Sequence, residues 1–134
     1  MATSVVFYSG NLRTESRHLQ SGDKIITDAP TDNEGNGVAF SPTDLAATSL
    51  ANCMMTVMGI TANHHNIDIN GTRADVEKFM GVNPRRIVKI KIDFHFPISY
   101  DTVTKKLLET SALNCPVAKS LSGSISQNIH FNYG

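Results

Sequence analysis

The most constraining feature of the sequence is a stretch from Leu45 to Asn63 that contains no charged residue. The residues before it carry the chemistry of a helix N-terminus, because Ser41 is a good N-cap, Pro42 suits the first helical position and Asp44 brings a negative charge to the first turn. Ser41 and Asp44 are also three residues apart, which is close to the capping-box pattern. Small and apolar side chains then occur on every face. We therefore predict a long central helix from Ser41 to His65 that is buried all round.

The length and charge of the chain narrow the class of protein. A chain of 134 residues is expected to form a single domain over residues 1–134. Its 12 basic and 12 acidic residues cancel, so charge gives no reason to expect a nucleic acid or an anionic membrane as a partner. The uncharged stretch is long enough to suggest a membrane-spanning helix, but the Thr, Ser and Asn side chains within it are too polar for one.

The N-terminus and the cysteine content suggest the cellular setting. The chain does not begin with a basic segment followed by an apolar one; Met1 to Gly10 is typical of a strand instead. The sequence has 2 cysteines. We therefore expect a cytoplasmic protein, in which a disulfide would be transient and catalytic rather than structural.

The rest of the chain is predicted to consist of short strands and helices. Runs of β-branched and aromatic residues between turns, and the alternation of apolar and charged residues from Ile87 to Phe96, indicate strands. The expected strands are 4–8, 12–19, 24–27, 67–80, 87–96 and 125–133, and the expected further helices are 99–113 and 116–121. Residues 73–80 are compatible with a helix as well, but the alternation that follows favours a strand. The order βββ-α-ββ-αα-β predicts an α+β fold. In it, the first three strands form an antiparallel meander, and the long buried helix packs against an antiparallel sheet.

The central helix also bears on the oligomeric state. A helix that is apolar on every face needs cover on more than one side, and a monomer of this size has one sheet to offer. We therefore expect a homodimer, in which the partner supplies the second layer. The loop from Asp28 to Val38, rich in Pro, Asp, Asn and Gly, precedes this helix and is a candidate rim for substrate access.

The two cysteines, Cys53 and Cys115, are compatible with few kinds of active site. A zinc site would need two further ligands, and the histidines show no paired ligand spacing with either cysteine, so we expect no metal and no bound cofactor. A Cys–His hydrolase is not expected, because His64 lies about 16 Å from Cys53 along a helix axis. His64 and His65 fit a polar helix end. A redox pair and two unrelated core thiols remain as alternatives.

Local context affects the reactivity of each thiol. Pro116 suits the first position of a helix and makes Cys115 its N-cap, where the helix dipole lowers a thiol pKa. Cys53 lies about twelve residues inside its helix. Apolar surroundings there would raise its pKa, so it needs a nearby cation to become a thiolate. From this reasoning alone, either cysteine is a candidate for the attacking one.

Several short segments spread along the chain form a recognisable set. They are Ser-Pro-Thr-Asp-Leu from Ser41, Ala-Asn-Cys at Cys53, Cys-Pro-Val-Ala-Lys from Cys115, Gly-Asn-Leu-Arg ending at Arg13, an Asn-Pro-Arg-Arg turn and the Phe-Asn-Tyr end. In these segments, and over nearly its whole length, the chain resembles the OsmC/Ohr family of thiol peroxidases. The resemblance implies an OsmC-like fold, an intertwined homodimer with two active sites at its interface, and a role in oxidative and osmotic stress defence.

The resemblance also implies a role for each cysteine and for an arginine. Cys53 would be the peroxidatic thiolate, which attacks the O–O bond of an organic hydroperoxide, or of H₂O₂, and becomes a sulfenic acid. Cys115 would then form an intramolecular disulfide with it, and a dithiol reductant, lipoyl-type in part of the family, would restore both thiols. An N-terminal arginine activates the thiolate in this family; Arg13 is the best match, with Arg17 as the alternative.

One position departs from the family pattern. The residue after the proline at the helix start is commonly a Glu that orients the arginine, but here it is Thr43. Asp44 is a candidate replacement, although one residue turns a side chain by about 100° on a helix, and helix capping is an equally good role for it. The departure places the chain nearer the general OsmC-like branch. It also favours, as an alternative, a non-catalytic dimer that binds an apolar ligand or senses redox state.

Overall fold

The structure is a computed structural model that describes residues 1–134, and its α+β architecture follows the predicted order βββ-α-ββ-αα-β. The strands are β1 (Ser4–Gly10), β2 (Arg13–His18), β3 (Lys24–Asp28), β4 (Arg73–Gly81), β5 (Arg86–His95) and β6 (Ser126–Asn132). The helices are α1 (Pro42–His64), α2 (Thr102–Leu113) and α3 (Pro116–Ser120), with a 3-10 turn η1 (Thr31–Asn33) in the loop before α1. The chain divides into two compact units, Met1–Leu45 and Ala46–Gly134. The expectation of a single domain stays a prediction.

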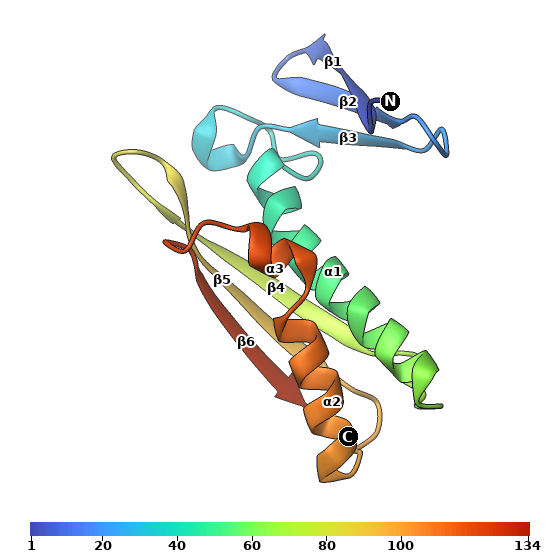
Figure 1. Ribbon diagram of the computed structural model, residues 1–134. Helices are drawn as coiled ribbons and strands as arrows, with labels where there is room; N and C mark the ends of the chain where they lie inside the picture. Colours follow the sequence, from blue (N-terminus) through green and yellow to red (C-terminus); the bar gives the residue numbers. More distant parts are fainter. The chain divides into compact units, whose positions relative to one another are not determined.

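The first unit contains the predicted antiparallel meander, in the order β1-β2-β3 (Figure 1). Asn11 and Leu12 join β1 to β2, and both have positive φ, 56° and 63°, as a two-residue hairpin loop of type I′ requires. This tight connection makes Arg13 the first residue of β2. On its other side β2 pairs with β3, and the register sets Arg13 opposite Asp28.

Helix α1 begins with a complete capping box, which confirms that interpretation of its first residues. The Ser41 N–H donates to Asp44 Oδ2 over 2.9 Å, and the Asp44 N–H donates to Ser41 Oγ over 3.1 Å. Each group satisfies an amide that the helix itself leaves without a partner. α1 then runs to His64, close to the predicted end.

The expectation that α1 is buried on every face is wrong for the single chain. Its buried residues form one stripe at helical spacing: Ala47, Leu50, Ala51, Met54, Met58 and Ala62. Asn52 and Thr56 are exposed, and 51% of Ile60 is accessible. The physical reason is that one chain offers this helix one sheet face and one neighbouring helix. α1 is also long and apolar enough to cross a membrane by length and composition, a criterion that the core helices of soluble proteins meet as well.

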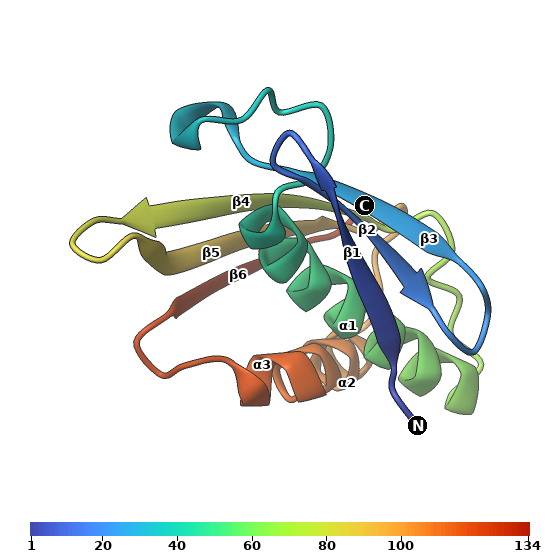
Figure 2. The same cartoon turned by 90° about the horizontal axis from the view of Figure 1, so that it is seen from above.

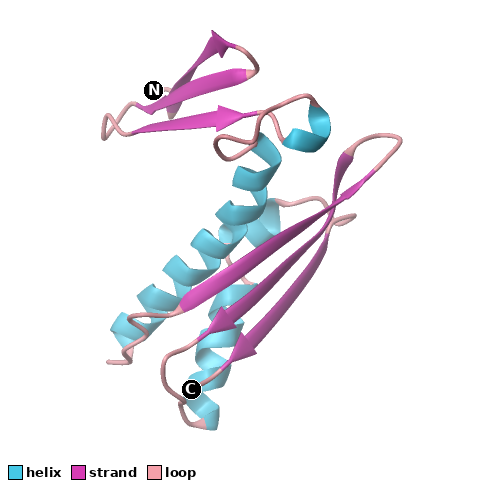
Figure 3. Cartoon of the chain, turned by 180° about the vertical axis from the view of Figure 1, so that it is seen from behind, coloured by secondary structure: helices cyan, strands magenta, loops and turns pink.

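The second unit is built on the three-stranded sheet β4-β5-β6. β5 alternates as predicted, with Ile90, Ile92 and Phe94 fully buried between partly exposed charged residues. Figure 2 shows α1, α2 and α3 on one side of this sheet, and Figure 3 shows its other face without a helix. The sequence predicted an antiparallel sheet, and this is wrong for one strand pair: β6 pairs parallel to β5. The connection from β5 to β6 runs through α2 and α3, and a parallel pair requires a crossover of such length.

The start of β4 differs from the prediction as well. Residues 67–72 are not a strand, because the chain turns there: Asn66 and Gly71 have φ of 54° and 86°, and the Thr72 N–H donates to the Ile69 carbonyl. Ile67 and Ile69 still pack against the core, which accounts for the apolar pattern that suggested a strand.

Helix α2 begins at Thr102 rather than at Ser99, because Asp101 is its N-cap and accepts a hydrogen bond from the Thr104 N–H over 2.8 Å. The short third helix and the last strand lie close to their predicted positions.

Candidate functional site

The two cysteines, 62 residues apart in the sequence, meet within the second unit. Cys53 is a half-buried residue of α1, and Cys115 is fully buried where α2 ends and α3 begins. Both thiols are free, and Cys53 lies close enough to Cys115 to raise the pKa of its thiol. Packing of α2 on α1 brings them together. Leu108 and Ala112 join the buried stripe of α1 in one core, and the hydroxyls of Thr61 and Ser111 are hydrogen-bonded at 2.6 Å.

Cys115 is the N-cap of α3, as the sequence predicts. Its Sγ accepts a hydrogen bond from the Ala118 N–H at 3.4 Å, and Pro116 is the first residue of the helix. The expected lowering of its thiol pKa is wrong in sign. Burial raises the pKa of Cys115, the adjacent Cys53 thiol raises it further, and the amides of Ala118 and Val117 only partly offset this. Desolvation prevails because the sulfur is inside the core and α3 is a single short turn. Cys115 therefore favours the neutral thiol.

A second polar cluster lies in the first unit and consists of Arg13 and Asp28. Arg13 Nε is 3.8 Å from Asp28 Oδ1; the Arg13 side chain is 38% exposed and that of Asp28 is 0% exposed. Asp28 Oδ2 accepts a hydrogen bond from the Val38 N–H over 3.1 Å. The sequence reasoning named Arg13 and missed Asp28. The available signal was the predicted meander, whose pairing sets the end of the third strand opposite the start of the second.

Arg13 also lines a pocket of about 360 Å³ within the first unit. The lining combines polar side chains of the meander with apolar ones of β3 and the following loop: Ser9, Arg13, Thr14, Glu15, Ile26, Val38 and Ala39. Val38 belongs to the loop that was expected to form a substrate rim. The alternative arginine, Arg17, is exposed on β2 and pairs in register with Val5 and Lys24. The pocket thus joins an arginine to an apolar wall.

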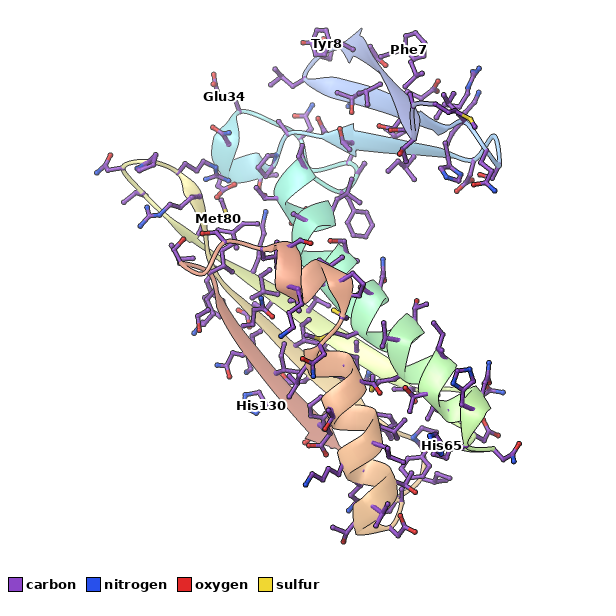
Figure 4. All side chains as sticks on the ribbon, in the orientation of Figure 1. Phe7, Tyr8, Glu34, His65, Met80 and His130 are labelled. Carbon is purple, nitrogen blue, oxygen red and sulfur yellow. The ribbon has the colours of Figure 1, made fainter.

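Asp44, the candidate replacement for the family glutamate, holds the N-terminus of α1 through the capping box, and Thr43 contributes a hydroxyl 3.2 Å from Ser41 Oγ. The catalytic role of Asp44 stays a prediction. His64 and His65 are exposed at the other end of α1, where Figure 4 shows His65. No group of three or more His, Cys, Asp or Glu side chains is arranged to hold a metal ion.

Comparison with known proteins gives a direct result for the family. A sequence model described as OsmC-like protein matches residues 34–130, which include both cysteines and the whole of α1. The chain belongs to the OsmC-like family. This confirms the resemblance drawn from the cysteine segments. No curated protein sequence matches this OsmC-like chain.

Solved structures agree with the family assignment. A protein from Psychrobacter arcticus 273-4, provisionally named an osmotic stress induced and detoxification response protein, is 52% identical over 98% of this chain and 96% of its own, with a TM-score of 0.95. Organic hydroperoxide resistance proteins from Legionella pneumophila (17% identity, 98% of each chain, TM-score 0.76) and Elizabethkingia anophelis (14% identity, 100% of this chain and 98% of that one, TM-score 0.77) share the fold. The OsmC-like fold predicted from the sequence is confirmed.

Proposed function

We propose that this OsmC-like protein is a cysteine-based peroxidase that reduces organic hydroperoxides, and also H₂O₂, in oxidative and osmotic stress defence. The observation that carries the proposal is that a half-buried thiol, Cys53, lies beside a fully buried one, Cys115. Two neighbouring thiols can be oxidised to a disulfide and reduced again by exchange. Their unequal exposure supports different roles, because a peroxide reaches Cys53 more readily than Cys115.

In the proposed reaction, the Cys53 thiolate attacks one oxygen of the peroxide bond. The O–O bond breaks, the other oxygen leaves as an alcohol after taking up a proton, and Cys53 becomes a sulfenic acid. The Cys115 sulfur then attacks the Cys53 sulfur, the S–S bond forms and water leaves. An external dithiol, for which a lipoyl-type group is one chemical candidate, reduces the disulfide by exchange and is itself oxidised. A reducing cytoplasm would supply that reductant.

Arg13 is our proposal for the cation that favours the Cys53 thiolate. A guanidinium stabilises a neighbouring thiolate by charge, and its several N–H groups can also hold a peroxide oxygen. Arg13 is supported over Arg17 because it lines an apolar-walled pocket and pairs with a buried carboxylate. Asp44 remains the candidate from the sequence for orienting this arginine.

We also propose that the protein is a homodimer. Large apolar side chains of the first unit are more than half exposed in the single chain: Val6, Phe7, Tyr8, Ile26 and Phe40. Figure 4 shows Phe7 and Tyr8 projecting from β1. Exposed apolar surface on this scale is typical of an interface. Sedimentation analysis of Phe7→Lys is expected to give a monomer. The matched surface change Val103→Lys, at an exposed position of α2, is expected to leave the dimer intact.

A single-turnover experiment tests the peroxidase proposal. Reduced protein is mixed with one equivalent of cumene hydroperoxide or of H₂O₂, and its free thiols are titrated. The wild type is expected to lose both thiols, Cys115→Ser to hold a sulfenic acid at Cys53 that dimedone traps, and Cys53→Ser to keep its thiol. The two single variants serve as controls for each other. Survival of both wild-type thiols would refute the peroxidase, and exchanged behaviour of the two variants would reverse the roles of the cysteines.

The alternative is a non-catalytic dimer that binds an apolar ligand or senses redox state, and Thr43 in place of the family glutamate is the observation that favours it. A redox sensor would form the disulfide once and turn over slowly with any dithiol. Steady-state consumption of hydroperoxide with dihydrolipoamide separates these functions. Sustained turnover supports the enzyme, and a single oxidation without turnover supports the sensor.

A further inference from the structure

Asp28 is the one ionisable side chain that the first unit buries completely. The end of β3 fixes its backbone, since the Asp28 N–H donates to the Phe40 carbonyl over 3.1 Å, and its Oδ2 accepts from the Val38 N–H. A carboxylate removed from water is costly unless a cation and hydrogen bonds compensate it. A rigid, buried carboxylate at this place therefore implies a partner of opposite charge.

Arg13 is that partner, and its side chain both approaches Asp28 and lines the pocket. Its Nε lies 3.8 Å from Oδ1 of Asp28, the residue opposite it in the β2–β3 register. The same side chain is partly exposed and lines the pocket with Ile26 and Val38, whereas Asp28 is not among the lining residues. Arg13 is thus held from the protein side while it faces the pocket on the other.

The Arg13 guanidinium and the Asp28 carboxylate are near each other but do not form a hydrogen bond. At 3.8 Å the atoms form an ion pair, but both Arg13 Nε and Asp28 Oδ1 are buried without a hydrogen bond. A charge-assisted hydrogen bond spans about 2.8 Å, so a displacement of about 1 Å would close it. A guanidinium has five N–H donors, and one directed at Asp28 leaves the others for a ligand or a thiolate.

We propose that Asp28 is the positioning residue of the arginine site: its buried carboxylate closes on Arg13 Nε and aims the remaining N–H groups into the pocket that Arg13 lines, where they hold the peroxide. This inference rests on the proposed function and gives Arg13 an acidic partner other than Asp44. The negative charge of Asp28 also offsets part of the positive electrostatic potential that Arg13 provides, which works against thiolate formation. Orientation outweighs that loss, because Arg13 is a long, partly exposed side chain and Asp28 is fixed by the backbone around it.

Asp28→Asn is the test variant, because it keeps an acceptor for the Val38 N–H and removes the charge. Its Cys53 is expected to react with cumene hydroperoxide about 10- to 100-fold more slowly, the cost of a reacting group misplaced by about 1 Å. Asp23→Asn, which removes an exposed carboxylate at the β2–β3 turn of the same unit, is expected to react at the wild-type rate. Asp28→Glu should recover part of the loss.

A double-mutant cycle separates positioning from simple support of the fold. If Asp28 acts through Arg13, Arg13→Ala with Asp28→Asn will be no slower than Arg13→Ala alone. Additive losses would overturn the proposal, and so would an Asp28→Asn variant as fast as or faster than wild type. The same cycle with Asp44→Asn gives the coupling of Arg13 to Asp44. Coupling to Asp44 and not to Asp28 would overturn the proposal and make Asp44 the residue that orients Arg13.

A measurement that does not depend on activity completes the test. The Nε–H resonance of Arg13 in a nitrogen-15 NMR spectrum is expected to be protected from exchange in the wild type and in Asp23→Asn, and to lose that protection in Asp28→Asn. An unaltered Arg13 resonance in Asp28→Asn would overturn the proposal. If the wild type fails to react with peroxide but the resonance responds, the peroxidase function fails while the hold of Asp28 on Arg13 stands.

Discussion

The two compact units bury opposite kinds of side chain. In the second unit, the fully buried residues are aliphatic, aromatic and sulfur-containing, and they form one core around β5, α1 and α2. In the first unit, the buried residues are Thr27, Asp28 and Ser41, while large apolar side chains of β1 and β3 are exposed. The second unit therefore has the core that a stable domain needs. The first unit is organised around polar contacts, and its apolar surface is free to pack against something else.

The two units therefore hold the candidate site residues by different kinds of interaction. The second unit holds the two thiols by packing them into or against its apolar core. The first unit holds an arginine and its carboxylate by hydrogen bonds of strand ends and loop.

The sharpest test of the comparison is a matched pair of aromatic truncations. Phe94→Ala removes a ring that is fully buried and stacked on Phe131 at 5.4 Å, and should lower the free energy of unfolding by about 3–5 kcal/mol. Phe7→Ala removes a ring that is 54% exposed, and should cost far less in protein kept monomeric by dilution. Urea denaturation followed by circular dichroism measures both. Equal losses would show that the first unit has a core of its own.

Alkylation of the native reduced protein compares the two thiols within the second unit. Iodoacetamide is expected to modify Cys53 at least about tenfold faster than Cys115, because thiolates react and Cys115 is buried with a raised pKa. Peptide mass spectrometry at several times measures each site, with urea-unfolded protein as the control in which the difference disappears.

The raised pKa of Cys115 also has a pH dependence with a definite sign. Its neutral form is favoured by folding, so the associated stability is present below the ordinary thiol pKa and is lost as pH rises through the higher folded value. The reduced wild type should therefore lose stability in alkaline solution more steeply than Cys115→Ser. Parallel curves for the two proteins would contradict the burial argument.

A smaller effect is expected where polar contacts fix the start of α1. Ser41→Ala removes the hydroxyl that accepts the Asp44 N–H and should cost about 1 kcal/mol, the usual value for an N-cap. Ser41→Asn, which retains a capping acceptor, is the control and should restore most of the loss. Thermal unfolding measures both. A negligible loss would mean that the polar contacts of the first unit contribute little to its order.

The smallest effect is expected on the open face of the second sheet. Asp75 pairs with Arg73 at 3.3 Å and with His95 at 3.1 Å, but its side chain is 58% exposed. Asp75→Asn should change stability by no more than about 0.5 kcal/mol, since solvent screens such pairs. A loss above about 1 kcal/mol in urea titrations would show that this face is covered rather than open.

Local sequence rules predicted the parts of the fold that local interactions determine. The alternation of β5, the capping box of Ser41 and the N-cap role of Cys115 each depend on residues within one turn or one strand. The parallel direction of β6 was missed because it depends on a crossover through two helices. The pKa of Cys115 was predicted with the wrong sign, because the helix dipole is a local feature and desolvation is a tertiary one.

The candidate site divides in the same way. The cysteines were found because short segments around them carry family-typical residues. Asp28 was missed because its importance comes from strand pairing with Arg13 and from burial. The residues next to it in the sequence indicate neither property.

The path of α1 has a consequence for how such a protein can change over evolutionary time. The boundary between the two units falls between Leu45 and Ala46, inside the first turns of this helix, rather than in a linker. A break there would separate the capping box from the helix that it starts. The two parts are therefore not exchangeable modules that recombination can shuffle. A gene for the second part alone would encode α1 without its first turn, Pro42–Leu45, so the two parts are expected to be inherited, lengthened and lost together.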